Sequence, residues 1–216
     1  MDGAAASTPA HRILRERTRD AHEAVEAAEG MRRLMDGRMD QAGYEVLLAA
    51  QLKLFREWEA ERGKWLAGIS PHWLYLSRIA ALETDTRFCG GQVATRSGIA
   101  DESAPTEQGP APYRTPLGRS RFSGDSQDAT NWGELYVIEG STLGARLIVK
   151  HLRERFPAHP HRYYAMGETT PARWRRFQSL LDAELTDDDA RHHAVEGAHH
   201  MFARFRQALQ DPAAHV

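Results

Sequence analysis

The chain has 216 residues, with 28 Lys and Arg against 30 Asp and Glu, and a formal net charge of −2 at pH 7. This length suits one domain with a full hydrophobic core. The nearly balanced charge provides no overall basic field for nucleic acid or for an anionic membrane surface. The single cysteine, Cys89, excludes an internal disulfide and any metal site built from several cysteines.

The N-terminal sequence, the apolar runs and the cysteine content indicate the compartment of the protein. The first ten residues lack a basic start followed by an apolar core, so no secretory signal is predicted. No apolar run reaches the length of about 20 residues that a membrane-spanning helix needs. A single cysteine is compatible with the reducing cytosol. We therefore expect a cytoplasmic protein with one domain over residues 1–216 and no membrane-spanning segment.

Apolar residues recur at helical spacing along most of the chain, and strand patterns are nearly absent. The first predicted helix has Ser7 or Thr8 as its N-cap and Pro9 in its first turn. Its core stripe consists of Leu14, Thr18, Ala21 and Val25. The pattern as a whole predicts an all-α fold.

Two more helices are predicted before residue 90. One begins at Asp40, a residue type suited to capping, and runs to about Arg62. The other follows Ser70 and Pro71. Its apolar positions are Leu74, Leu76, Ile79 and Leu82. Residues 90–130 are rich in Gly, Ser, Pro, Thr and Asp without a sustained period, so we expect a long, mobile surface loop there.

The helix expected after this loop carries two glycines in its interior. Within the apolar run 131–147, Gly140 and Gly144 each cost about 1 kcal/mol relative to alanine. Spaced by four residues, they project from one face of the helix, which is predicted to end near Arg155. Such glycines permit either tight packing of another helix or the approach of a flat ligand to bare backbone.

Two helices are predicted near the C-terminus. One begins at Thr170 and Pro171, and the other begins at Thr186 with Asp187 in an acidic first turn, where the helix dipole favours negative charge. The buried positions of the first are Trp174, Phe177, Leu181 and Leu185. The stripe of the second consists of Ala198, Phe202, Phe205 and Leu209.

His22 is a candidate metal ligand on the first helix. It lies about 60° from the centre of the core stripe, at its edge. Arg15 precedes it by seven residues and Glu26 follows it by four, so all three share one side of the helix. Glu26 would accept a hydrogen bond from one ring nitrogen while the other binds a metal. A structural histidine would show the same local pattern, so both interpretations stay open at this point.

Four segments, in this order, carry a resemblance to a known family. They are LRERTRDAHEAVE, LYVIEGSTLGARLI, RYYAMGETTPARWRRFQSLLDAEL and AVEGAHHMFARFRQAL. The chain resembles the biliverdin-producing haem oxygenases, in particular the bacterial branch associated with phytochromes. The likeness spans nearly the whole chain and is weakest across residues 90–130. It implies an all-α bundle that holds haem between the first helix and the glycine-bearing helix.

The resemblance assigns roles to several residues. It makes His22 the iron ligand, and Gly140 and Gly144 the positions that let the distal helix bend over the haem. Many relatives carry an aspartate beside the first glycine to organise distal water, and here that position is Ser141. Because a hydroxyl replaces the carboxylate, the resemblance leaves the role of that carboxylate unassigned. It therefore does not specify the rate or the regiochemistry of ring opening.

The resemblance also assigns residues that would contact the haem propionates and the haem edge. The family binds the propionates with basic residues of its first and penultimate helices, which here are Arg15 and Arg175, with Arg176 as the alternative to the latter. Arginine suits carboxylates because its planar fork binds them bidentately. The further haem contacts expected from the first and last helices are Thr18, Glu26, Phe202 and Phe205.

The implied function is haem oxygenation. Haem would be both prosthetic group and substrate, O2 the co-substrate, and the products biliverdin, carbon monoxide and ferrous iron. No GxGxxG-type nucleotide motif is present, so a separate electron donor, a ferredoxin or a reductase, is expected. A bacterial phytochrome is a possible recipient of the biliverdin.

Two other functions are compatible with the same helices. One is a non-catalytic protein of the same fold that binds or delivers haem. The other is a di-iron carboxylate oxidase, but a symmetric di-iron site needs two Glu-x-x-His motifs and two further glutamates. The chain offers a single such motif, Glu196 with His199.

Overall fold

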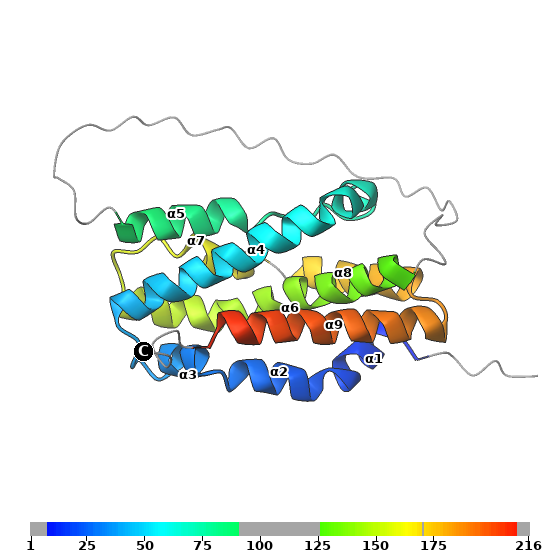
Figure 1. Cartoon of the computed structure of the whole chain (residues 1–216), viewed down its shortest axis with the longest axis horizontal. Helices are drawn as coiled ribbons and strands as arrows, with labels where there is room; N and C mark the ends of the chain where they lie inside the picture. The colour runs from blue at the N-terminus through cyan, green and yellow to red at the C-terminus, as the bar shows by residue number, and fades with distance from the viewer. Residues whose placement is uncertain (1–7, 91–125, 170, 211–216) are drawn as a thin grey trace, which may run out of the picture.

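The computed structural model describes residues 8–90, 126–169 and 171–210 (Figure 1). Over these ranges the chain forms helices joined by turns, without strands, which confirms the predicted all-α fold. The helices are α1 (Ala10–Arg17), α2 (Arg19–Glu26), α3 (Glu29–Met35), α4 (Gln41–Ile69), α5 (Ile79–Gly90), α6 (Ser126–Arg155), α7 (Arg162–Ala165), the 3-10 helix η2 (Met166–Thr169), α8 (Pro171–Glu184) and α9 (Asp188–Ala208).

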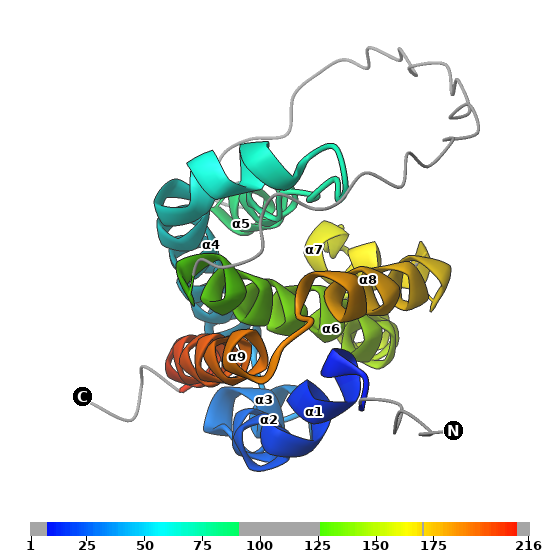
Figure 2. The same ribbon diagram turned by 90° about the vertical axis from the view of Figure 1, so that its right-hand side faces the viewer.

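Helices α6 and α9 form the centre of the molecule and run side by side in the same direction (Figures 1 and 2). Helices α1, α2 and α3 lie on one side of this pair, and α4, α5 and α7 lie on the other. Each central helix presents a glycine to the backbone of its neighbour. A Cβ atom at Gly133 would overlap the Ala194 carbonyl group, and one at Gly197 would overlap that of Thr130. The two backbones therefore touch at this crossing.

The buried carboxylate of Glu134 ties α6 to α4 and α9. Glu134, with no exposed surface, accepts hydrogen bonds from Trp58 Nε1 at 2.8 Å and from Arg62 Nε at 2.9 Å. Its second oxygen lies 3.0 Å from His200 Nδ1. Burial alone would raise the pKa of Glu134, but the donors from Arg62, His200 and Trp58 hold that pKa below its ordinary value. Glu134 therefore stays ionised and fixes the first half of α6.

The first predicted helix is interrupted. Helix α1 ends at Arg17 and α2 begins at Arg19, because Thr18 adopts φ −108° and ψ 12°. The Thr18 hydroxyl donates to the Leu14 carbonyl oxygen at 2.7 Å, and this type of bond to the preceding turn bends helices. The residue that precedes α1 is Pro9, so Thr8 is not its N-cap, and Ser7 lies outside the described residues. Helix α3 was not predicted, because its seven residues have no side-chain cap at their start.

Asp40 caps α4 as predicted, accepting a hydrogen bond from Gly43 N at 2.8 Å, but α4 continues to Ile69 rather than ending near Arg62. The helix predicted after Pro71 begins later than expected, at Ile79, so its predicted start is wrong, whereas two of its predicted positions, Ile79 and Leu82, lie in α5. Residues 71–78 are not helical, and two of the expected core positions, Leu74 and Leu76, are 65% and 43% exposed.

A single carboxylate of α4 explains why residues 71–78 avoid a helix. Glu59 accepts hydrogen bonds from the Tyr75 hydroxyl at 2.9 Å, the Ser77 hydroxyl at 2.8 Å and the Arg78 backbone N–H at 3.2 Å. These bonds hold the segment along α4 until α5 begins at Ile79.

The predicted C-terminal boundary of the loop over 90–130 is wrong by about five residues. Helix α6 begins at Ser126, so residues 126–130 are helical, whereas residues 91–125 lie outside the described residues. Its end at Arg155 agrees with the prediction. Asp187 is the N-cap of α9, accepting from Ala190 N at 2.8 Å, rather than part of its first turn. The predicted stripe of α9 is buried throughout.

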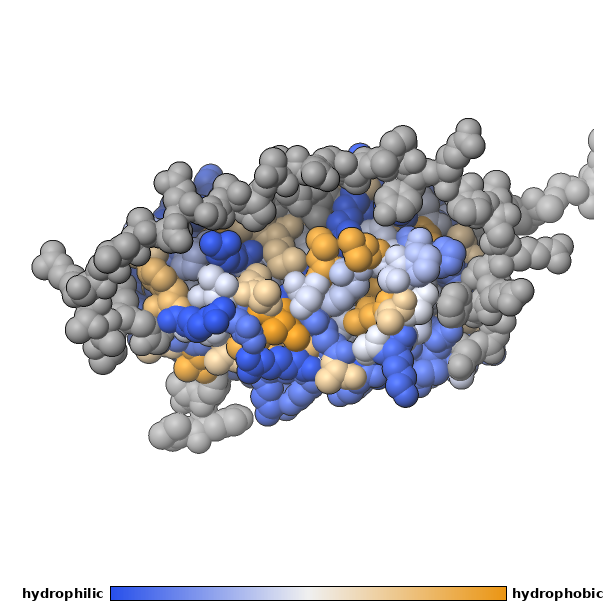
Figure 3. Space-filling view, turned by 90° about the horizontal axis from the view of Figure 1, so that it is seen from above, coloured by the Kyte–Doolittle hydropathy of each residue, from blue (hydrophilic) through white to orange (hydrophobic). Residues whose placement is uncertain are grey.

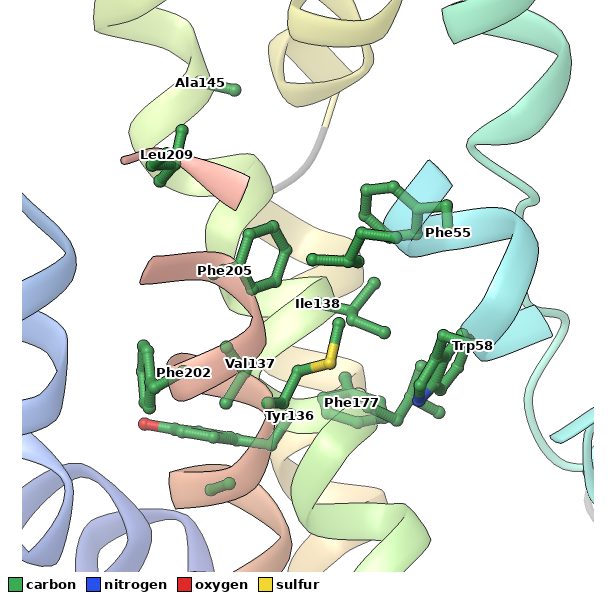
Figure 4. Close-up of a cluster of buried hydrophobic side chains, with 14 of the residues drawn as sticks. Phe55, Trp58, Tyr136, Val137, Ile138, Ala145, Phe177, Phe202, Phe205 and Leu209 are labelled. Atoms are coloured by element: carbon green, nitrogen blue, oxygen red, sulfur yellow. The ribbon is translucent and has the colours of Figure 1, made fainter. Parts of the chain in front are cut away.

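No described helix is long and apolar enough to cross a membrane. On the face shown in Figure 3, hydrophobic and hydrophilic residues are interspersed. The apolar side chains gather instead in the interior, where Phe55, Trp58, Ile138 and Phe177 pack among α4, α6 and α8 (Figure 4).

We expect Gly133→Ala to lower the free energy of unfolding by about 1–3 kcal/mol or more, because the new methyl group meets backbone that cannot move aside. Urea unfolding measures the loss. The matched control is Gly63→Ala, at an exposed position of α4 where a Cβ meets nothing within 4 Å, and a gain of up to about 1 kcal/mol is expected there. Equal effects at the two positions would show that the α6–α9 contact is not tight.

Candidate functional site

A cavity of about 980 Å³ extends between α2 and the middle of α6 and is lined also by α9, α8 and α4. Its volume lies at the upper end of the range of about 300–1,000 Å³ for small-molecule sites. Figure 4 shows part of its wall, in which Phe202 and the ring of Tyr136 lie on the side of α6 and α9 that faces the first helices. The cavity is therefore large enough for a sizeable organic ligand.

His22 lines this cavity from α2. Its Nδ1 lies 3.8 Å from Glu26 Oε1, and its ring meets that of Phe202 edge-on with 5.8 Å between the centroids. The other ring nitrogen, Nε2, makes no hydrogen bond with any described residue, and 57% of the side chain is exposed. At 3.8 Å the Glu26 carboxylate lies near Nδ1 but beyond hydrogen-bond distance, and Nε2 is available to a metal. Metal-binding histidines have a related arrangement, in which the second ring nitrogen is hydrogen-bonded to a carboxylate.

The wall of α6 that lines the same cavity contains Gly140, Ser141 and Gly144. A Cβ at Gly144 would meet nothing within 4 Å, and one at Gly140 would approach only the Trp174 ring, at 3.3 Å. Tight helix packing therefore accounts for Gly133 but not for Gly144. Helix α6 remains continuous through both glycines, so bare helical backbone faces the cavity.

The hydroxyl groups along this wall are occupied within their own helices. Ser141 donates to the Ile138 carbonyl oxygen at 2.8 Å, and Thr142 donates to that of Glu139 at 2.7 Å. Thr18, which lines the cavity from the α1–α2 junction, donates to Leu14. Each hydroxyl oxygen can still accept a hydrogen bond, but its hydrogen is not directed into the cavity.

One end of the cavity carries positive charge. Arg15 and Arg19, one turn apart, both line it and are exposed, so their guanidinium groups are accessible to an anion. Nearby, burial raises the pKa of Tyr136, and the Arg15 charge opposes that rise. The opposite end is apolar, with Met31, Met35 and Leu147 in its lining.

The structure does not bring Arg175 to the cavity. Helix α8 turns Trp174 and Gln178 inward, four residues apart, and both line the cavity. Arg175 and Arg176 follow Trp174 by about 100° and 200° around the helix and are exposed. Arg19, which the sequence interpretation missed, is the second arginine in the lining. Its position four residues after Arg15 and three before His22 is the signal that could have indicated it.

The other predicted site residues are brought together. Glu26, Phe202 and Phe205 line the cavity along with the positions already described, and the two phenylalanines are also part of the core, being 7% and 5% exposed. The structure offers no support for a di-iron centre, since no three His, Cys, Asp or Glu side chains of the described residues are grouped to hold a metal. Glu196 instead pairs at the surface with His192 and His193.

A family model described as heme oxygenase matches residues 8–211. The chain belongs to the haem oxygenase family. A curated heme oxygenase from Xanthomonas campestris pv. campestris (strain 8004) is 35% identical over 182 residues, which cover 83% of this chain and 96% of that protein. Haem binding and haem oxygenase activity accompany this membership.

Solved haem oxygenases share the fold. The structure of the Leptospira interrogans enzyme has a TM-score of 0.65 and 15% identity, with 94% of this chain and 98% of that chain covered. Heme oxygenase-1 from the cyanobacterium Synechocystis sp. PCC6803, solved in complex with heme, has a TM-score of 0.66 and 15% identity, with 94% of this chain and 91% of that chain covered.

The residues that line the cavity fit a haem. An imidazole with a free Nε2 faces the cavity, cations stand at one end where carboxylates would lie, and the other end is apolar. Bare backbone at Gly144 leaves room for a flat macrocycle. The fit is thus supported by charge, by polarity and by space.

We expect Gly144→Leu to weaken haem binding about tenfold or more, since the side chain would fill space that haem requires. Titration with haemin, followed in the Soret region, measures the change. The control Gly144→Ala adds one methyl group in open space and should raise the stability of the haem-free protein by up to about 1 kcal/mol. Wild-type haem affinity in Gly144→Leu would contradict this assignment.

Proposed function

We propose that this chain cleaves haem with O2 and externally supplied electrons to biliverdin, carbon monoxide and ferrous iron, with His22 as the axial ligand. The observation that carries the proposal is the free Nε2 of His22 in one cavity with the bare backbone of Gly140 and Gly144. Family membership supports haem as the substrate.

His22 would bind the haem iron, and Glu26 would orient the His22 ring. A neutral imidazole is the axial ligand that leaves iron able to bind and reduce oxygen, and this iron chemistry is what haem supplies when bound. Glu26, 3.8 Å from Nδ1, would attract the Nδ1 proton and so keep Nε2 as the ligand atom.

The α6 wall would keep the other haem face accessible. Gly140 and Gly144 place no side chain there, and Ser141 offers an oxygen that accepts a hydrogen bond from water. Phe202 and Phe205 would exclude bulk water from the haem edge, because both rings are largely buried between α9 and the cavity. These residues orient haem and limit the solvent around it.

The propionates would lie at the charged end. Arg15 and Arg19 supply two guanidinium groups from one face of the α1–α2 segment, with Thr18 between them. Arg175 would reach a propionate only from the outer surface of α8, so we assign it a lesser part in the clamp. A clamp built mainly by α1 and α2 would fix the rotation of haem about the His22 bond.

Electrons would come from a partner, a ferredoxin or a reductase, since the sequence shows no nucleotide-binding motif for a bound donor of its own. Biliverdin release to a bacterial phytochrome in the cytoplasm would place the chain in the phytochrome-associated branch. The whole chain, residues 1–216, would act as a single domain.

We expect His22→Ala to lose the wild-type Soret band and biliverdin formation while retaining the helical signal in far-UV circular dichroism. Haemin is added first, then ascorbate or a ferredoxin–reductase system, and the visible spectrum is followed. His199→Ala, at an exposed position of α9, is the matched control and should behave as wild type. Wild-type absorption and turnover in His22→Ala would place the ligand elsewhere. Haem binding without biliverdin from the wild type would indicate a haem-delivery protein.

We expect the double variant Arg15→Gln/Arg19→Gln to bind haem at least tenfold more weakly and to yield a wider mixture of biliverdin isomers. A hydrogen bond to a charged group contributes about 1.5–3 kcal/mol, and about 1.4 kcal/mol corresponds to a factor of ten. Chromatography separates the isomers. Arg175→Gln should cause a smaller change in both quantities. The reverse order would assign the main clamp to α8.

A further inference from the structure

A carboxylate of α8 caps the beginning of α1. Pro9, the residue before α1, makes no side-chain hydrogen bond to the helix. Instead, Asp182 Oδ1 accepts a hydrogen bond from the backbone N–H of His11 at 3.0 Å. The first N–H groups of a helix have no partner inside it, so a carboxylate at this position satisfies one of them and suits the helix dipole. Asp182 therefore acts as the cap of a helix that lies 171 residues before it.

The same carboxylate also binds the His11 side chain. Asp182 Oδ2 lies 2.8 Å from His11 Nδ1, and Oδ1 lies 3.0 Å from it. An ionised carboxylate only accepts hydrogen bonds, so Nδ1 carries the hydrogen. The two side chains are 23% and 31% exposed, so the pair is partly shielded from water. One aspartate thus holds both the backbone and the ring of one α1 residue, in what we call the His11–Asp182 contact.

This contact is the polar attachment of α1 to the rest of the described structure. The other side chains of α1 make no hydrogen bond to another described helix. Ala10 and Leu14, each 1% exposed, bury α1 in the core, and their spacing of four residues places them along one line of the helix. Apolar contacts are not directional, so they allow α1 to turn slightly about its axis. The His11–Asp182 contact opposes that turn.

The His11–Asp182 contact lies one helical turn from the charged end of the cavity on both of its helices. Arg15 follows His11 by four residues, and Gln178 precedes Asp182 by four. Residues four apart share a helix face, and both Arg15 and Gln178 line the cavity. Figure 2 shows α1 below α8, and the two helices are in contact. The position of Arg15 relative to the α8 wall therefore depends on this contact.

We propose that Asp182 is a positioning residue for haem. By capping α1 from α8 it fixes Arg15, and the fixed guanidinium group sets the rotation of haem about the His22 bond. That rotation decides which meso carbon faces the α6 wall, so Asp182 contributes to the choice of biliverdin isomer without touching haem. The proposal rests on the proposed function, because it needs a haem propionate at Arg15.

The test is Asp182→Ala, which removes both bonds to His11. In the haem-free protein, the α1 amides should exchange their hydrogens about tenfold faster, because the helix loses its cap. In the ferric haem–cyanide complex, proton NMR should show a new set of haem methyl signals from a second rotation of haem. The share of minor biliverdin isomers should rise about twofold or more, since a lost hydrogen bond shifts such equilibria by this order.

Two further variants separate positioning from stability. Asp182→Asn keeps an oxygen that can accept from the His11 N–H, so it should retain the wild-type methyl signals and isomer ratio. Asp40→Ala removes a bond of the same kind from α4, where Asp40 accepts from Gly43 N at 2.8 Å, and Asp40 does not line the cavity. It should lower the urea midpoint about as much as Asp182→Ala does and leave the methyl signals unchanged.

Wild-type methyl signals and isomer ratio in Asp182→Ala would overturn the positioning role and leave the proposed function intact. Equal disturbance of the methyl signals in Asp40→Ala would also overturn it, because lost stability rather than a displaced Arg15 would then be the cause. A disturbance in Asp182→Asn as large as in Asp182→Ala would exclude the cap as the route. Failure of the wild type to bind haem would overturn both this proposal and the proposed function.

Discussion

The backbone contact between α6 and α9 is the constraint on which the rest of the structure depends. Because Gly133 and Gly197 have no Cβ, the two helices touch at one crossing, and their later turns, with Val137, Phe202 and Phe205, become walls of one cavity. The buried carboxylates Glu134 and Glu139 then fix α6 from several sides. Glu139 accepts from Trp73 at 3.2 Å and from Arg173 at 3.1 Å, and lies 3.5 Å from Arg78.

The contacts of Glu134 and Glu139 explain how α6 tolerates Gly140 and Gly144. Two interior glycines lower the intrinsic stability of a helix by about 1 kcal/mol each, and charge-assisted bonds to buried carboxylates contribute comparable or larger amounts. The anchors lie just before the glycines, so bare backbone can face the cavity while the helix stays continuous. The cavity that this wall lines has a charged end at Arg15 and Arg19 and an apolar end at Met31 and Met35. A flat ligand with carboxylates at one edge matches both ends.

The parts of the fold that local chemistry determines could be predicted from the sequence. Asp40 caps α4, the stripe through Phe205 is buried, and His22 lies with Glu26 on one face of α2. Tertiary contacts decided the rest. Glu59 holds residues 71–78 out of a helix, and only the docking of α8 determines that Gln178 rather than Arg175 faces inward. Gln51 of α4 and Tyr164 of α7 are 113 residues apart and meet at the cavity, so no spacing in the sequence indicates this contact.

The central claim is that His22 and the Gly140–Gly144 wall hold one haem between them. The most direct measurement is a crystal structure of the protein with haemin, with anomalous scattering recorded at the iron absorption edge. The account predicts one iron peak at bonding distance from His22 Nε2, with the backbone of Gly140 and Gly144 on the opposite haem face. An iron peak bound by another side chain, or haem located outside this cavity, would contradict it.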